Sequence, residues 1–180
     1  MRGAAHPGRA SSEMNGMAFD DHRAEISVLF VCLGNICRSP TAEGVFRKLL
    51  AENGLDGRIR VDSAGTGGYH VGAPPDARAM AAAKARGVDL SGIRARKVAS
   101  EDFERFDLIL AMDQDNLDDL RDSAPGETRA RMALLLDFAP QRHERAVPDP
   151  YYGGKNGFER VLDLVTEACA GLLEDLRRRI

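Results

Sequence analysis

The sequence lacks long apolar runs, abundant cysteines and clustered histidines, and each absence excludes a class of protein. A membrane-spanning helix needs about 20 consecutive apolar residues, and no run in this chain approaches that length. Three cysteines cannot all pair, and the four histidines lack the spacing of a zinc site. The net charge is −3, which argues against a nucleic-acid partner. We therefore expect no disulfide scaffold, metal, membrane or nucleic acid, and a reducing cytoplasm as the location.

The first 24 residues differ from the rest of the chain. They combine glycine, alanine, serine and charged residues without helical or strand periodicity, and they contain no apolar segment of a secretory signal. We interpret residues 1–24 as a disordered tail, or as coding sequence upstream of a true start at Met14 or Met17. Acidic residues disfavour a mitochondrial presequence. By size, we expect residues 25–180 to form one domain, which we expect to be monomeric.

From Ile26 onward, the patterns of strand and helix alternate. Short β-branched runs indicate buried strands, and longer runs with apolar residues on one face indicate helices. Such alternation predicts an α/β domain, in which an open parallel sheet of about four strands carries helices on both faces. We expect strands over 26–31, 58–62, 108–112 and 131–135, and helices over 41–53, 75–86, 100–103, 113–122 and 158–176.

The segment VCLGNICRSP, from Val31 to Pro40, carries the strongest chemical signal. It joins the first strand to a helix start, where Ser39 is a candidate cap and Pro40 fits the first turn. A strand, a tight loop and a helix N-terminus together present several backbone N–H groups to one anion. The segment therefore predicts a phosphate site, whose ligating residues are Leu33, Gly34, Asn35, Ile36, Cys37, Arg38 and Ser39.

Cys32, at the start of this loop, is the candidate nucleophile. The helix N-terminus and the Arg38 guanidinium both favour its thiolate form, and the guanidinium fork matches two phosphoryl oxygens. Gly34 is expected to turn the backbone with positive φ, and Asn35 tolerates the left-handed region. The Ser39 hydroxyl either donates to the sulfur when it leaves or caps the helix. These features indicate a cysteine phosphatase.

Asp149 is the candidate general acid, which would protonate the leaving oxygen. Flanking prolines hold it on a stiff loop, and the two tyrosines that follow are expected to shield its carboxyl group, which favours the protonated form. Asp113 is a second acidic candidate at a strand end. We prefer for it the role of capping the next helix, close to Asn116.

These motifs resemble the low-molecular-weight protein tyrosine phosphatases. The resemblance extends over about residues 26–178, in the family's order. It is carried by CLGNICRSP at 32–40, DSAGT at 62–66, VG at 71–72, PDARA at 75–79, FDLILAMD at 106–113 with Asn116, and DPYYG at 149–153. The family usually has a tryptophan in the loop after Ser-Ala-Gly; this chain contains none, and Tyr69 stands there.

The resemblance implies hydrolysis of phosphotyrosine in proteins, and of small aryl phosphates, through a cysteinyl-phosphate and without any cofactor. Cys32, Arg38 and Asp149 would be catalytic. The substrate pocket would be lined by Ile36, Tyr69, Tyr151 and Tyr152, whereas His70 is expected to be an ordinary loop residue. Cys37 either forms a reversible disulfide with Cys32 or packs as a small residue, and Cys169 is expected to be a core thiol.

Three other functions remain as alternatives. Arsenate reductases share this loop but relay a disulfide through two further cysteines, of which only Cys169 is available here. Protein-arginine phosphatases of this type carry threonine in place of Ile36. A phosphate-binding module without turnover would have no need for Cys32, Arg38 and Asp149 together.

Overall fold

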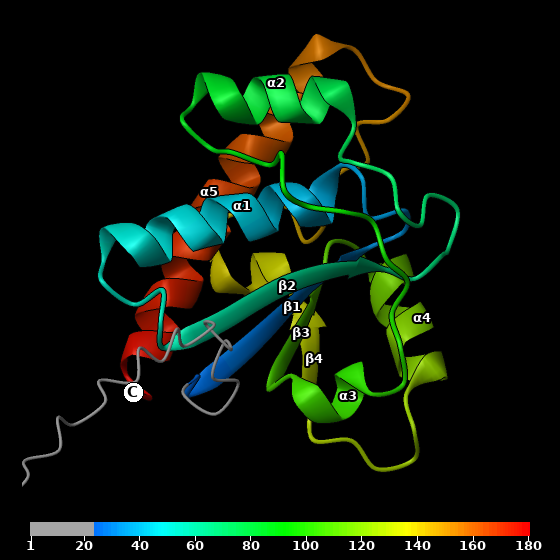
Figure 1. The fold of residues 1–180 in the computed structure, drawn as a ribbon, viewed down its shortest axis with the longest axis vertical. Coiled ribbons are helices and arrows are strands. Elements are labelled where there is room, and N and C mark those ends of the chain that lie inside the picture. Colours follow the sequence, from blue (N-terminus) through cyan, green and yellow to red (C-terminus); the bar gives the residue numbers. More distant parts are fainter. Residues whose placement is uncertain (1–23) are drawn as a thin grey trace, which may run out of the picture.

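The computed structural model describes residues 24–180. The predicted tail, residues 1–24, therefore lies outside the described residues except for Ala24. A four-stranded parallel sheet forms the centre of the domain, with the strand order β2-β1-β3-β4 (Figure 1). The strands are β1 (Ile26–Cys32), β2 (Ile59–Gly65), β3 (Leu108–Ala111) and β4 (Arg131–Leu134). The predicted parallel α/β sheet is confirmed.

The helices overlap the five predicted segments, and their ends differ by a few residues. They are α1 (Arg38–Glu52), α2 (Ala77–Ala85), α3 (Asp102–Arg105), α4 (Gln114–Ser123) and α5 (Lys155–Arg177). A 3₁₀ turn, η1 (Leu135–Phe138), was not predicted. The predicted last strand ended at Leu135, where the chain instead begins this turn, and the sequence has no glycine or proline there to mark the change.

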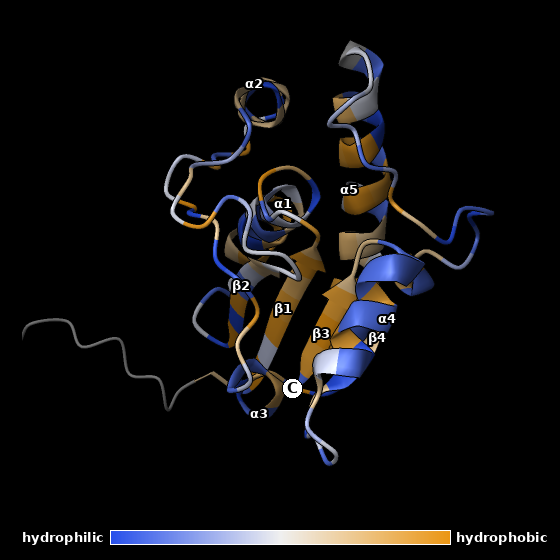
Figure 2. Cartoon of the chain, turned by 90° about the vertical axis from the view of Figure 1, so that its right-hand side faces the viewer, coloured by the Kyte–Doolittle hydropathy of each residue, from blue (hydrophilic) through white to orange (hydrophobic). Residues whose placement is uncertain are grey.

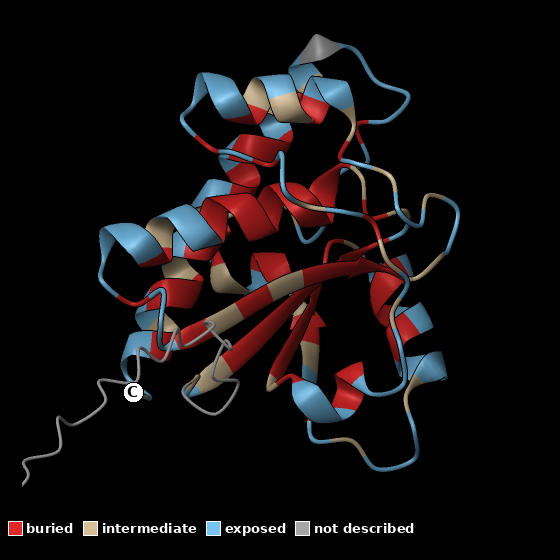
Figure 3. Ribbon diagram, viewed as in Figure 1, coloured by how far each residue is buried: buried red, intermediate tan, exposed pale blue. Residues whose placement is uncertain are grey.

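Two hydrophobic layers cover the sheet, because side chains along β1 alternate between its faces. Val28 and Phe30 point into the larger layer, beneath α1, α2 and α5, whereas Leu29 and Val31 point into the smaller one, beneath α3 and α4. Figure 2 shows the apolar strands between these helices, and Figure 3 shows that the strands and the inner sides of the helices are buried. Helices on both faces are thus confirmed.

The strand order places the ends of β1 and β3 side by side. From β1 the chain crosses to β2 on one side and later returns to β3 on the other, so the order reverses between β1 and β3. Open α/β sheets bind ligands at such a switch point, outside the carboxyl ends of the strands. A third segment reaches this edge, because the Val147 N–H donates to the Met112 carbonyl oxygen over 2.8 Å. Within residues 24–180, no helix is both long and apolar enough to cross a membrane.

Candidate active site

The loop between β1 and α1, which we call the phosphate loop, begins at Cys32 and leads into the helix at Arg38. Pro40 lies in the first turn, as predicted, where no N–H donor is needed. Of the two roles considered for Ser39, the structure excludes the cap, because Cys37 is the N-cap residue and no side chain caps the helix. Ser39 is already the second helical residue, and its Oγ lies 3.0 Å from the Cys32 sulfur instead.

The tight turn of the loop is made by Asn35, whose φ is 56°. The left-handed conformation predicted for Asn35 is confirmed. The positive φ predicted for Gly34 is wrong, because the turn is already made by the next residue. A Cβ atom at Gly34 would lie 3.0 Å from the His70 ring, so a larger residue there would require that ring to shift.

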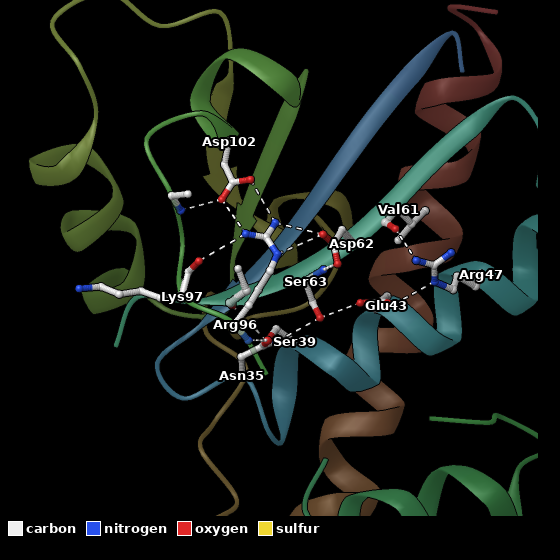
Figure 4. A network of polar contacts seen from close by, with 12 residues as sticks. Asn35, Ser39, Glu43, Arg47, Val61, Asp62, Ser63, Arg96, Lys97 and Asp102 are labelled. Carbon is white, nitrogen blue, oxygen red and sulfur yellow. Dashed lines mark hydrogen bonds and ion pairs between the residues drawn. The ribbon is translucent and has the colours of Figure 1, made fainter. Parts of the chain in front are cut away.

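Asn35 is held in this conformation by three hydrogen bonds, although only 1% of it is exposed. Its Nδ2 group donates to Ser39 Oγ over 2.8 Å and to Ser63 Oγ over 3.0 Å. Its Oδ1 atom accepts from the backbone N–H of Arg96 over 3.0 Å. A non-glycine residue in the left-handed region is strained, and these bonds offset the cost. Figure 4 shows Asn35 at the lower end of the network, beside Ser39.

The direction of each bond in the network follows from Glu43, a buried residue ion-paired with Arg47. A carboxylate only accepts, so the Ser63 hydroxyl donates to Glu43 Oε1 over 2.7 Å. Ser63 Oγ therefore accepts from Asn35, as does Ser39 Oγ. The Ser39 proton then points at the Cys32 sulfur, 3.0 Å away, in preference to the Ala64 carbonyl oxygen, which lies 3.4 Å away. This orientation stabilises a thiolate, because a hydrogen bond to a charged acceptor is the stronger kind.

Arg96 links this network to two other elements. Its guanidinium bridges Asp62 on β2, at 3.0 Å, and Asp102 on α3, at 2.8 Å (Figure 4). These ion pairs fix the segment whose backbone N–H binds Asn35. The sequence did not reveal this clamp, because Asp62 lies 34 residues before Arg96 and only folding brings the two together.

Arg38 lies beneath the loop and is 4% exposed. Its Nη1 group donates to Asp113 Oδ2 over 2.6 Å and to the Val147 carbonyl oxygen over 3.1 Å, and its Nη2 lies 3.9 Å from Asp149 Oδ2. Asp113 also caps α4, because its Oδ1 accepts from the Asn116 N–H over 2.8 Å. The predicted capping role is confirmed. The contact with Arg38 was missed, although both residues follow the ends of neighbouring strands.

Asp149 lies at the pocket, close to Arg38, as expected for a group that acts beside the phosphate site. Its Oδ1 accepts from the Tyr151 N–H over 3.0 Å. The prediction that the tyrosines shield the carboxyl group is wrong, because the Asp149 side chain is 48% exposed and Tyr152 is 93% exposed. The Tyr151 ring is 37% exposed, and the two tyrosine rings meet edge to face with their centres 4.9 Å apart.

These residues enclose a hollow of about 370 Å³, with the cysteine sulfur at its base. Tyr69 lines it, together with the two tyrosines of residues 148–153, the segment around Asp149 that we call the acid loop. His70, which lies in a loop as expected, also lines it. Its position next to Tyr69 was the available signal. The lining residues are Cys32, Leu33, Gly34, Ile36, Cys37, Arg38, Tyr69, His70, Asp149, Tyr151 and Tyr152.

The other two cysteines are buried thiols. Burial, and then the nearby Asp76 carboxylate, raise the pKa of Cys37 to about 12. Cys169 on α5 is fully buried, and burial raises its pKa as well. The predicted core thiol is therefore confirmed, whereas a disulfide between Cys37 and Cys32 stays a prediction, because both are free thiols in the structure. Among residues 24–180, no group of three histidine, cysteine or acidic side chains is arranged to hold a metal.

Known proteins resemble this chain in both sequence and fold. The model of a family described as "Low molecular weight phosphotyrosine protein phosphatase" matches residues 27–180. A human protein with that name is 47% identical, the match covering 84% of this chain and 96% of the human one. A putative low molecular weight protein-tyrosine-phosphatase of Synechocystis is 46% identical over 86% of this chain and 99% of its own length. The crystal structure of a protein tyrosine phosphatase from Entamoeba histolytica, with Hepes in its active site, superposes with a TM-score of 0.82 at 42% identity, covering 85% of this chain and 97% of that one.

Proposed function

Because the chain belongs to the low molecular weight phosphotyrosine protein phosphatase family, we propose that it hydrolyses phosphotyrosine in proteins, and small aryl phosphates, through a cysteinyl-phosphate on Cys32. Arg38 binds the phosphoryl group and Asp149 moves the protons. The observation that carries the proposal is the meeting of these three side chains in one hollow, although Asp149 lies far along the chain from the other two. No cofactor is needed for either step.

In the first step, the Cys32 thiolate attacks phosphorus and the bond from phosphorus to the tyrosyl oxygen breaks. Asp149 gives its proton to that oxygen, so the leaving group departs as a neutral phenol. Backbone N–H groups of residues 33–39 and the Arg38 fork stabilise the charge on the phosphoryl oxygens. The product of this step is a phosphorylated cysteine and an ionised Asp149.

In the second step, water attacks the same phosphorus atom and the sulfur–phosphorus bond breaks. Asp149 now removes a proton from the water, which restores its acidic form. The departing sulfur takes the bonding electrons and becomes a thiolate again. Ser39 Oγ, 3.0 Å from the sulfur, supports this departure, because its proton points at the sulfur.

Exposed apolar side chains around the hollow support an aromatic substrate on a protein. The large hydrophobic residues that are exposed within residues 24–180 are Leu33, Tyr69, Val71, Tyr151 and Tyr152, and all but Val71 line the hollow. Exposed apolar groups gathered in one place mark an interaction site. This collar suits a phenyl ring that enters the hollow and apolar residues of the substrate beside it.

Trapping of the intermediate tests the proposal. Acid quench during turnover of p-nitrophenyl phosphate, followed by mass spectrometry, should place one phosphoryl group on Cys32. The Cys32→Ser variant should fold normally and release no phosphate. Cys169→Ala is the matched control, since it removes a sulfur that lies in the core and should retain turnover. Phosphate release by Cys32→Ser, or absence of the adduct, contradicts the proposed chemistry.

Substrate preference is tested by comparing phosphotyrosine, phosphoserine and phosphoarginine peptides of one sequence. We expect the phosphotyrosine peptide to be the best substrate, because Ile36 places an apolar group at the hollow. Faster release from phosphoarginine would support the arginine phosphatase instead. Arsenate reduction is disfavoured, because the fully buried Cys169 is poorly suited to relay a disulfide. The cytoplasmic location and the monomeric state stay predictions from the sequence.

A further inference from the structure

Asp76, at the start of α2, is attached to the phosphate loop. Its N–H donates to the Ile36 carbonyl oxygen over 2.8 Å, within the loop that follows β1. Its carboxylate caps α2 by accepting from the Arg78 N–H over 2.8 Å. The position of Asp76 is thus fixed by the loop on one side and by the helix on the other.

Arg78 binds the same carboxylate with two atoms of its guanidinium. Nε lies 3.1 Å from Asp76 Oδ1 and Nη2 lies 3.0 Å from Oδ2. The hydrogen bond from Arg78 is the main cause that lowers the pKa of Asp76, so the pair is ionised at neutral pH. A bidentate pair fixes the plane of the guanidinium as well as its place.

The other side of this guanidinium meets the acid loop. Nη2 also donates to the Tyr151 carbonyl oxygen over 3.1 Å. The central carbon lies 5.6 Å from the centre of the Tyr151 ring and 4.8 Å from that of the Phe158 ring on α5. Cation–π contacts of this length attract the rings to the charge. Tyr151 in turn donates its N–H to Asp149 Oδ1 over 3.0 Å.

A continuous series of contacts therefore runs from the phosphate loop through Asp76, Arg78 and Tyr151 to the carboxyl group of Asp149. We propose that Arg78 is a positioning residue, which holds the acid loop at the distance from the phosphate loop that proton transfer requires. This role rests on the proposed function of Asp149 as the acid. Arg78 does not line the hollow, so it acts on the reaction through Tyr151 and not by touching substrate.

Arginine is suited to this role because one flat group makes all of the contacts. Replacement by lysine keeps a charge but loses the two-point contact with Asp76 and the flat face against the rings. Replacement by methionine keeps the approximate length of the side chain and removes the charge as well as these contacts. The series Arg, Lys, Met therefore grades the strength of the link without adding bulk to the loop.

The test compares kcat/KM for phenyl phosphate, whose leaving group needs a proton, and for p-nitrophenyl phosphate, whose leaving group does not. We expect Arg78→Met to reduce kcat/KM about tenfold with phenyl phosphate and less than about twofold with p-nitrophenyl phosphate, because a small displacement of a catalytic group is costly only where that group acts. Arg78→Lys should lie between. In an Asp149→Ala background, Arg78→Met should add less than about twofold for either ester.

Arg86→Met is the matched control. Arg86 follows the same helix and pairs with Glu159 at 2.6 Å and Asp163 at 2.9 Å on α5, but these contacts do not reach the acid loop. It should lose stability comparable to Arg78→Met in thermal unfolding and keep both kcat/KM values. Equal losses on the two esters in Arg78→Met, or an undiminished loss in the Asp149→Ala background, overturn the positioning role. Failure of Asp149→Ala itself to discriminate between the esters would overturn the acid role and, with it, this inference.

Discussion

The two loops of the active site are built in opposite ways. In the phosphate loop, Asn35 is 1% exposed and Arg38 is 4% exposed, and both make several hydrogen bonds to distant parts of the chain. In the acid loop, the Asp149 side chain is 48% exposed and Tyr152 is 93% exposed. The first loop is part of the core of the domain, and the second lies on its surface.

This difference matches the tasks of the two loops. Binding of a phosphoryl group requires several donors at fixed positions before the substrate arrives, and a buried network provides that order. Proton transfer requires one carboxyl group that reaches the leaving oxygen and then admits water. Substitutions in the buried hydrogen-bond network of the phosphate loop should therefore lower activity and stability together. Substitutions in the acid loop should lower activity alone.

Asp149→Ala tests the acid loop and should have the largest effect on rate. We expect kcat/KM for phenyl phosphate to fall by about 10³, within the range that a general acid contributes. The free energy of unfolding in urea should change by less than about 0.5 kcal/mol, because the side chain is exposed. A large loss of stability would mean that the acid loop is structural and would remove the contrast between the loops.

Asn35→Ala tests the phosphate loop. It removes three hydrogen bonds and leaves the Arg96 backbone N–H without an acceptor, whereas Ser63 keeps its bond to Glu43, so unfolding should become easier by about 3 kcal/mol. We expect kcat/KM to fall about 10²-fold for good and poor leaving groups alike, since the whole loop shifts. Asn53→Ala, at an exposed helix end, is the control and should change neither quantity strongly. If Asn35→Ala kept full stability but lost activity, the buried hydrogen bonds of Asn35 would not be what stabilises the phosphate loop.

The contrast also explains how far the sequence could predict the site. The parallel sheet, the turn at Asn35 and the cap at Asp113 follow from residues that lie close together in the chain, and those predictions are confirmed. At Gly34 and Ser39 the local sequence is compatible with two arrangements. The turn could be made by Gly34 or Asn35, and the Ser39 hydroxyl could cap the helix or contact the sulfur; contacts with the rest of the fold decide between them. Ser39 faces the sulfur because Asn35 and the buried carboxylate behind it fix the hydrogen-bond directions.

The exposure of the acid loop could not be derived from its sequence. Tyrosines beside a carboxyl group are equally compatible with a covering and an open arrangement, and the choice depends on what the rings pack against. Here Tyr151 lies against the guanidinium of Arg78, which is on α2, far from Tyr151 along the chain. The place of His70 in the lining of the hollow depends in the same way on the return of a distant segment.

Asp113→Asn tests the contact that orients Arg38, which lies between the phosphate loop and the acid loop. Asparagine keeps an oxygen to cap α4 but presents an NH₂ group, which cannot accept, to the Arg38 guanidinium. Loss of one charge-assisted hydrogen bond, worth about 1.5 to 3 kcal/mol, should reduce kcat/KM at least about tenfold and weaken inhibition by inorganic phosphate. Asp115→Asn, an exposed neighbour, is the control. Unchanged phosphate inhibition would show that Arg38 needs no partner to hold its orientation.

The smallest expected effect concerns the buried Cys37 thiol in the phosphate loop and its contribution to the unfolding free energy at alkaline pH. Burial, with a smaller contribution from Asp76, raises the pKa of Cys37 from 9.0 to about 12, so the folded state keeps a proton that the unfolded state loses. The contribution of Cys37 to stability is therefore complete below pH 9 and declines as pH rises toward 12. Between pH 8 and pH 10, the wild type should lose about 1 kcal/mol more unfolding free energy than Cys37→Ala, by urea titration. Other alkaline titrations are common to both proteins and cancel in this difference. Equal losses would mean that water reaches Cys37, and that the phosphate loop is as open to solvent as the acid loop.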